Sequence, residues 1–212
     1  MSVNLIRPEN ARGVLAAGCL LGGMEDLCGY AYGACRQSIS VETIGEWLEF
    51  TDSIPLASDC SLTPQPHLTS VFGQYAGRLR EDVFHFLAVT LPNALEIGSE
   101  SGSSQGRDTL LQVFALAPFD MFKAAVESPT FQIGACLWCS RLSTMLDPYY
   151  LGSDQCRFKF AKDAIELRKR GIARGHGSEE TVVLAFGGGH MSGSAVHVTR
   201  KMRKRPLWKV NS

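Results

Sequence analysis

A pair of cysteines two residues apart, Cys136 and Cys139, is the clearest chemical motif in this sequence. Two thiolates at this spacing can bind one zinc ion, and they can also form a redox-active dithiol. A structural zinc site needs four ligands, so Cys156 is the expected third ligand and His176 the fourth, with His190 as its alternative. The chain has no second pair at this spacing, and a set of ordinary buried cysteines is the competing interpretation. Zinc is therefore the only cofactor predicted.

Positively charged residues in the last quarter of the chain form a second group with chemical potential. Cations spread along a surface bind phosphates, and a neighbouring aromatic ring can stack on an unpaired base. A histidine in a glycine-rich segment lies between the two halves of this group, where backbone N–H groups could approach a phosphate. The residues predicted to bind nucleic acid are Arg168, Lys169, Arg170, Arg174, His190, Arg200, Lys201, Arg203, Lys204, Arg205, Trp208 and Lys209.

The zero net charge of the chain hides a strong asymmetry. Residues 1–156 carry 8 Lys or Arg against 17 Asp or Glu, a net charge of −9, and residues 157–212 carry 13 against 4, a net charge of +9. Such a basic end indicates an anionic partner, which can be nucleic acid, an anionic membrane surface or an acidic protein. The same asymmetry is also compatible with a purely structural role. The two parts can neutralise each other across the fold, and Arg168–Arg170 can simply stabilise the end of a helix.

Catalytic motifs are scarce. The sequence contains no Gly-x-Ser-x-Gly elbow, no His-Glu-x-x-His and no phosphate-binding Gly-Lys-Ser/Thr step. His190 and His197, with basic neighbours, could support RNA cleavage by general acid–base catalysis. Since no positioned carboxylate accompanies them in sequence, we expect a protein without catalytic activity of its own.

Several segments show the periodicity of helices. Residues 40–51 have apolar positions at helical spacing behind a possible cap at Ser40, and residues 157–170 pair charges four residues apart. A further helix should open at Pro118, and residues 10–37 favour a buried helix capped by Asn10. These segments are the helical part of the predicted fold.

Other segments favour strands or loops. The run at 83–89 favours a buried strand, with a helix as the alternative, and His85 is expected in the core or at an interface. A shorter strand is expected at 130–135. Residues 181–186 and 194–200 predict a hairpin with an exposed glycine-rich tip at 187–193.

We therefore predict an α+β fold, a single mixed domain with a C-terminal β-hairpin and a basic tail. A mobile loop at 98–107 is the best internal boundary, between an acidic region at 1–97 and a region at 108–212 that holds the cysteine pair, the hairpin and the basic end.

The seven cysteines indicate a reducing compartment, and no segment has the length of a signal core or a membrane span. We expect a cytoplasmic protein, or a nuclear one in a eukaryote, that binds nucleic acid, RNA rather than DNA, as a subunit of a nucleoprotein complex with protein partners. One alternative is a protein–protein adaptor whose basic tail docks on an acidic partner. The other is a zinc-dependent or histidine-based nuclease.

Overall fold

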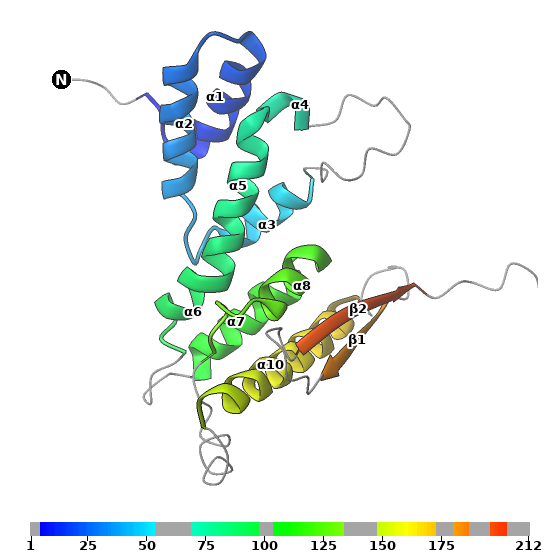
Figure 1. Ribbon diagram of the computed structural model, residues 1–212. Coiled ribbons are helices and arrows are strands. Elements are labelled where there is room, and N and C mark those ends of the chain that lie inside the picture. Colours follow the sequence, from blue (N-terminus) through cyan, green and yellow to red (C-terminus); the bar gives the residue numbers. More distant parts are fainter. Residues whose placement is uncertain are drawn as a thin grey trace, which may run out of the picture. The chain divides into compact units, whose positions relative to one another are not determined.

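Two compact units make up the chain. The first contains residues 1–94 and 116–118, and the second contains residues 95–115 and 119–212. Helices dominate the described residues, which also contain one two-stranded antiparallel sheet, in agreement with the coarse α+β prediction (Figure 1). The computed structural model describes residues 5–53, 69–97, 104–133, 148–172, 180–186 and 196–202.

The first unit begins with a helical hairpin in place of the one helix expected at 10–37. Helix α1 (Pro8–Leu21) and helix α2 (Glu25–Gln37) lie side by side (Figure 1). Gly22 and Gly23 have φ angles of 69° and 66°, a region that glycine enters without steric cost, and they turn the chain between the helices. Asn10 stabilises the start of α1 from inside its first turn, because its side chain accepts the Arg7 N–H at 2.8 Å.

Small residues bring these two helices close together, as the composition suggested. A Cβ atom added to Gly18 would lie 2.7 Å from the Sγ atom of Cys28, so the contact exists only because residue 18 has no side chain. The Sγ atoms of Cys19 and Cys28 lie 4.0 Å apart across the same interface. Helix packing at this point therefore depends on glycine.

Helix α3 (Ile44–Asp52) confirms the amphipathic helix predicted near 40–51. A reciprocal pair of hydrogen bonds precedes it: the Ser40 N–H donates to Thr43 Oγ1 at 2.9 Å, and the Thr43 N–H donates to Ser40 Oγ at 3.3 Å. Trp47 and Leu48 are buried, whereas Glu46 is exposed. Ser40 thus stabilises the turn that leads into the helix.

The predicted strand at 83–89 is wrong, because this region is helical. Helix α5 (Gln74–His85) continues through a π-helical turn, η1 (Phe86–Thr90), into helix α6 (Leu91–Ala94), and the short helix α4 (Thr69–Phe72) precedes them. The largest fully buried side chains of this continuous segment recur every four positions, which is helical spacing. They are Leu79, Val83, Leu87 and Leu91.

The described part of the second unit contains three longer helices: α7 (Ser104–Leu116), α8 (Phe119–Glu127) and α10 (Pro148–Ile172). Helix α8 follows Pro118 as predicted. Helix α10 includes the predicted segment 157–170 and extends beyond it at both ends. Two other expectations are corrected, since residues 104–107 belong to a helix and not to a loop, and residues 130–133 form no strand.

An aromatic cluster joins these helices. The ring centroids of Phe114 and Phe131 lie 4.8 Å apart, and Phe160 lies 5.1 Å from Phe114 in an edge-to-face arrangement. All three side chains are fully buried. Aromatic pairs at these separations add to the gain from apolar burial, so this cluster forms the centre of the unit.

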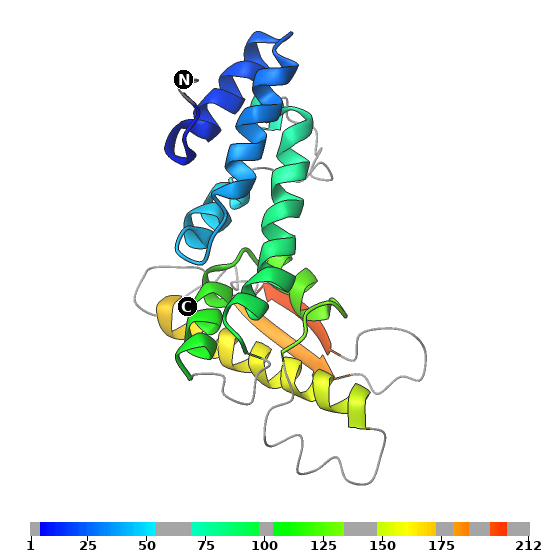
Figure 2. The ribbon, with the colours of Figure 1, turned by 90° about the vertical axis from the view of Figure 1, so that its left-hand side faces the viewer.

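The predicted hairpin is confirmed. Strand β1 (Glu180–Phe186) pairs antiparallel with strand β2 (Val196–Met202), with Leu184 opposite Val198. Helix α8 lies beside β2 and α10 beside β1 (Figure 2). Val196 and Val198 are fully buried, whereas His197 between them is exposed, as the alternation of a half-buried strand requires. The predicted tip at 187–193 lies outside the described residues.

Candidate functional sites

A row of cations follows the exposed face of α10. Lys159, Lys162 and Lys169 are exposed and recur at helical spacing, and no carboxylate in the described part of the chain forms an ion pair with any of them. Arg170 is also exposed and pairs with Glu166 at 2.7 Å, one of the two charge pairs predicted from spacing. The other predicted pair, Lys162 with Glu166, is not among the ion pairs of the described residues. We call Lys159, Lys162, Lys169 and Arg170 the α10 basic stripe.

Prediction from sequence found only half of this stripe. Lys169 and Arg170 were expected to bind nucleic acid and are exposed, while Arg168, predicted with them, is only partly exposed. Lys159 and Lys162 were missed, although their spacing with Lys169 on a predicted helix was a usable signal. The stripe spans about 15 Å, since a helix rises 1.5 Å per residue.

The hairpin presents two further predicted cations. Arg200 and Lys201 are exposed on β2. Successive residues of a strand point to opposite faces, so Lys201 shares a face with the exposed His197, while Arg200 lies on the other face, where its guanidinium carbon is 5.6 Å from the ring centroid of Phe119. Two predicted contacts are thus placed on opposite sides of one strand.

Most remaining site predictions fall outside the described residues. Of the four predicted zinc ligands only Cys156 is described, and it is buried in α10. No group of three His, Cys, Asp or Glu side chains suited to a metal occurs within the described ranges. Zinc binding at Cys136 and Cys139 stays a prediction. The predicted residues that lie outside are Cys136, Cys139, Arg174, His176, His190, Arg203, Lys204, Arg205, Trp208 and Lys209.

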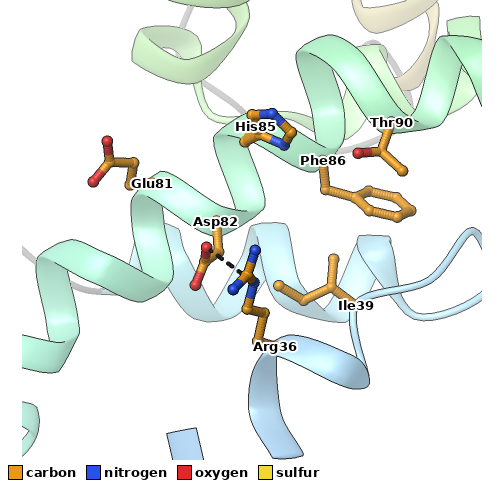
Figure 3. Close-up of a pocket in the computed structure, with 7 residues that line it drawn as sticks. All are labelled: Arg36, Ile39, Glu81, Asp82, His85, Phe86 and Thr90. Carbon is orange, nitrogen blue, oxygen red and sulfur yellow. Dashed lines mark ion pairs between the residues drawn. The ribbon is translucent and has the colours of Figure 1, made fainter. Parts of the chain in front are cut away.

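The first unit contains a cleft of about 370 Å³ that the sequence did not reveal (Figure 3). It lies between the end of α2 and the junction of α5 with η1. His85, expected in the core or at an interface, is exposed and lines this cleft. A π-helical turn is rare and often marks a functional position, and η1 supplies part of the lining. The lining residues are Arg36, Ile39, Glu81, Asp82, His85, Phe86 and Thr90.

Asp82 connects this cleft to a hydrogen-bond network. The Tyr32 hydroxyl donates to Asp82 Oδ2 at 2.5 Å, and Arg36 Nε lies 3.6 Å from Asp82 Oδ1. Burial and then the hydrogen bond to Asp82 raise the pKa of Tyr32 to about 12. Tyr32 therefore keeps its proton at neutral pH and orients the carboxylate, so it is no candidate for a base or nucleophile.

Exposed apolar side chains gather at the turn between α1 and α2. Leu20 and Leu21 are 66% and 71% exposed, and Met24 and Leu27 follow them across the turn with 41% and 37%. The exposed acidic residues Glu25 and Asp26 lie within the same eight residues. Contiguous exposed apolar surface is typical of interaction sites. We call Leu20, Leu21, Met24 and Leu27 the apolar tip.

None of the helices in the described part of the chain combines the length and hydropathy needed to cross a lipid bilayer. Comparison with protein families, curated proteins and solved structures finds no match for this chain.

Proposed function

We propose that the second unit binds nucleic acid, RNA rather than DNA, without catalysing a reaction. The observation that supports this proposal best is the α10 basic stripe, whose three lysines have no carboxylate partner among the described residues. Cations that are not already paired can release counterions from a phosphate backbone, which is the main source of affinity for nucleic acid. A stripe of about 15 Å is long enough to reach several phosphates of one strand, which carries a charge about every 3.4 Å in a duplex.

The sequence beyond β2 adds to this proposal. Arg203, Lys204, Arg205 and Lys209 follow directly after the exposed cations of β2, and Trp208 offers a ring on which an unpaired base can stack. Stacking of this kind requires a single strand, which is the basis for preferring RNA. Protein partners in a nucleoprotein complex belong to the same proposal.

A binding titration with a labelled single-stranded RNA tests the stripe. The double variant Lys159→Glu/Lys162→Glu should bind more weakly than the wild type by at least tenfold at low salt. Arg7→Glu/Arg78→Glu makes the same charge change at two exposed residues of the first unit and is the control, with affinity expected to stay within about twofold. If both variants bind as well as the wild type, α10 is not the contact surface.

Deletion of the tail tests the other half of the surface. Strand β2 extends to Met202, so removal of residues 203–212 takes away the basic tail and leaves the hairpin complete. The shortened chain should keep its circular dichroism spectrum and lose much of its RNA affinity. Unchanged affinity would rule out the tail as a binding element.

The apolar tip favours a second candidate, a protein–protein adaptor. Its exposed leucines beside Glu25 and Asp26 suit a partner with an apolar surface and basic neighbours. A pull-down with and without nuclease separates the two functions. Proteins that bind only through nucleic acid are lost on nuclease treatment, whereas direct partners of the tip persist and are lost in Leu20→Ser/Leu21→Ser.

A further inference from the structure

The two outer edges of the hairpin differ in whether their backbone groups already form hydrogen bonds. On β2, the Val198 N–H donates to Glu127 Oε1 at 2.7 Å, and the Val198 carbonyl accepts from Lys123 Nζ at 2.8 Å. Lys123 and Glu127 also pair with each other at 2.7 Å. An ion pair on α8 thus occupies the backbone groups of β2 that another strand would need.

Among the residues that the structure describes, no side chain covers β1 in this way. Val198 directs its backbone groups to the outer edge of β2, so Val198 and the opposite residue Leu184 form a non-hydrogen-bonded pair. The backbone N–H and carbonyl groups of Leu184, and those of Val182 two residues before it, therefore point to the outer edge of β1. The backbone N–H and carbonyl groups of Val182 and Leu184 that face away from β2 form no hydrogen bond with any of the described residues. The outer edge of β1 therefore offers donors and acceptors for a further strand.

The sequence of β1 also lacks the usual protection of an edge strand. Proteins guard exposed edges with charges, prolines or bulges. Residues 181–186, Thr-Val-Val-Leu-Ala-Phe, contain neither a charge nor a proline, and they pair with β2 without a bulge. Strand β2, in contrast, carries Arg200 and Lys201.

Apolar burial is incomplete on the same strand. Leu184 lies opposite the fully buried Val198, and residues opposite each other in a sheet share a face, so Leu184 and Val182 belong to the core face. Both are only partly buried, whereas Val196 and Val198 are fully buried. A strand added beside β1 would supply the missing neighbours.

We propose that a second copy of this chain covers β1 by antiparallel pairing of β1 with β1 about a two-fold axis at Val183. In this register Val182 pairs with Leu184 of the second copy, so the outward backbone groups satisfy one another. All seven residues of the strand find a partner, and the single charged residue, Glu180, comes opposite Phe186 and meets no like charge. The product is a four-stranded sheet with an isologous interface. This inference is independent of whether the protein binds nucleic acid.

The axis residue provides a sharp test by sedimentation velocity and light scattering of the full chain over a range of concentrations. The wild type should form dimers. Val183 lies opposite its own copy at the closest type of cross-strand pair, so Val183→Lys should be monomeric because two like charges meet there. The control is Thr199→Lys, which adds the same charge on the same face at the cross-strand partner of Val183, one strand away from the interface. This control should remain dimeric.

Charge complementation adds a gain of function. A mixture of Val183→Lys and Val183→Glu chains should form heterodimers, while each variant alone is monomeric. Circular dichroism checks that the variants are folded. If a variant fails to fold, the concentration series of the wild type still shows whether the protein dimerises. A wild type that stays monomeric at all concentrations would overturn the proposal, and so would a folded Val183→Lys that still dimerises.

Discussion

At the scale of single residues, the hydrogen bond between Tyr32 and Asp82 is the main polar contact that holds α2 to α5. Tyr32→Phe removes the donor and leaves the partly buried Asp82 carboxylate with Arg36 alone. Hydrogen bonds to a charged group contribute about 1.5–3 kcal/mol. We expect the free energy of unfolding at pH 7 to fall by about this amount in urea denaturation, with Tyr75→Phe, a neighbouring ring, as the control.

The same contact has a signature at alkaline pH. The pKa of Tyr32 is raised from 10.0 to about 12 in the folded chain, so its contribution to stability is complete below pH 10 and is lost as the pH rises through 12. The stability difference between the wild type and Tyr32→Phe should therefore shrink over this interval. A constant difference up to pH 12 would contradict the assigned contact.

Arg157 is a buried cation with one partner on its own helix and one on a distant segment of the chain. It is 5% exposed, donates to the Ser128 carbonyl at 2.6 Å and pairs with Asp154 one turn earlier in α10. Removing one partner of a buried ion pair leaves an uncompensated charge, at a cost of about 3–5 kcal/mol. We expect Asp154→Ala to destabilise the chain by this much in thermal or urea unfolding.

Two further variants test whether the buried charge causes this loss. Glu166→Ala breaks the exposed pair with Arg170 on the same helix and should cost less than about 1 kcal/mol. Asp154→Ala/Arg157→Met removes the charge together with its partner and should recover part of the lost stability. Equal losses in Asp154→Ala and Glu166→Ala would show that burial of Arg157 is not the cause.

At the scale of elements, close backbone contacts set where glycine is required. A Cβ atom on Gly106, in the first turn of α7, would lie 2.7 Å from the Leu95 carbonyl oxygen, a backbone atom that cannot move alone. Gly77 is an exposed glycine of α5 with nothing within 4 Å of the same position. Gly106→Ala should therefore lower stability by about 1–3 kcal/mol, while Gly77→Ala should raise it by about 0.5–1 kcal/mol through helix propensity. Thermal unfolding of the two variants measures both effects.

At the scale of the whole molecule, the charge asymmetry makes a prediction about salt. If about five or six cations contact phosphates of a single strand, the logarithm of the affinity should fall against the logarithm of salt concentration with a slope of about −4. Arg203→Glu/Lys204→Glu should reduce both the affinity and the slope. Trp208→Ala should cost about 1–3 kcal/mol with little change in slope, because stacking releases few counterions. A slope near zero would contradict nucleic-acid binding through phosphates and favour the adaptor function.

Local patterns predicted a substantial part of the fold. The hairpin, the helix after Pro118 and the centre of α10 were all found because their periodicity, glycines or charge spacing lie within a few residues of one another. The segment 83–89 was mistaken for a strand because a short apolar run fits a buried strand as well as a helix. Only the longer series from Leu79 to Leu91 distinguishes the two.

The sequence by itself determined where the charge lies, that β1 and β2 pair, and which cations follow the hairpin, since these properties depend on residue type and near neighbours. Only the tertiary structure decided that Tyr32 meets Asp82, that Phe114 stacks on Phe131 and meets Phe160 edge to face, and that Lys123 and Glu127 cover the edge of β2. The physical reason is the separation of these residues along the chain. Contacts between distant segments depend on how whole helices pack, and no local pattern encodes that packing.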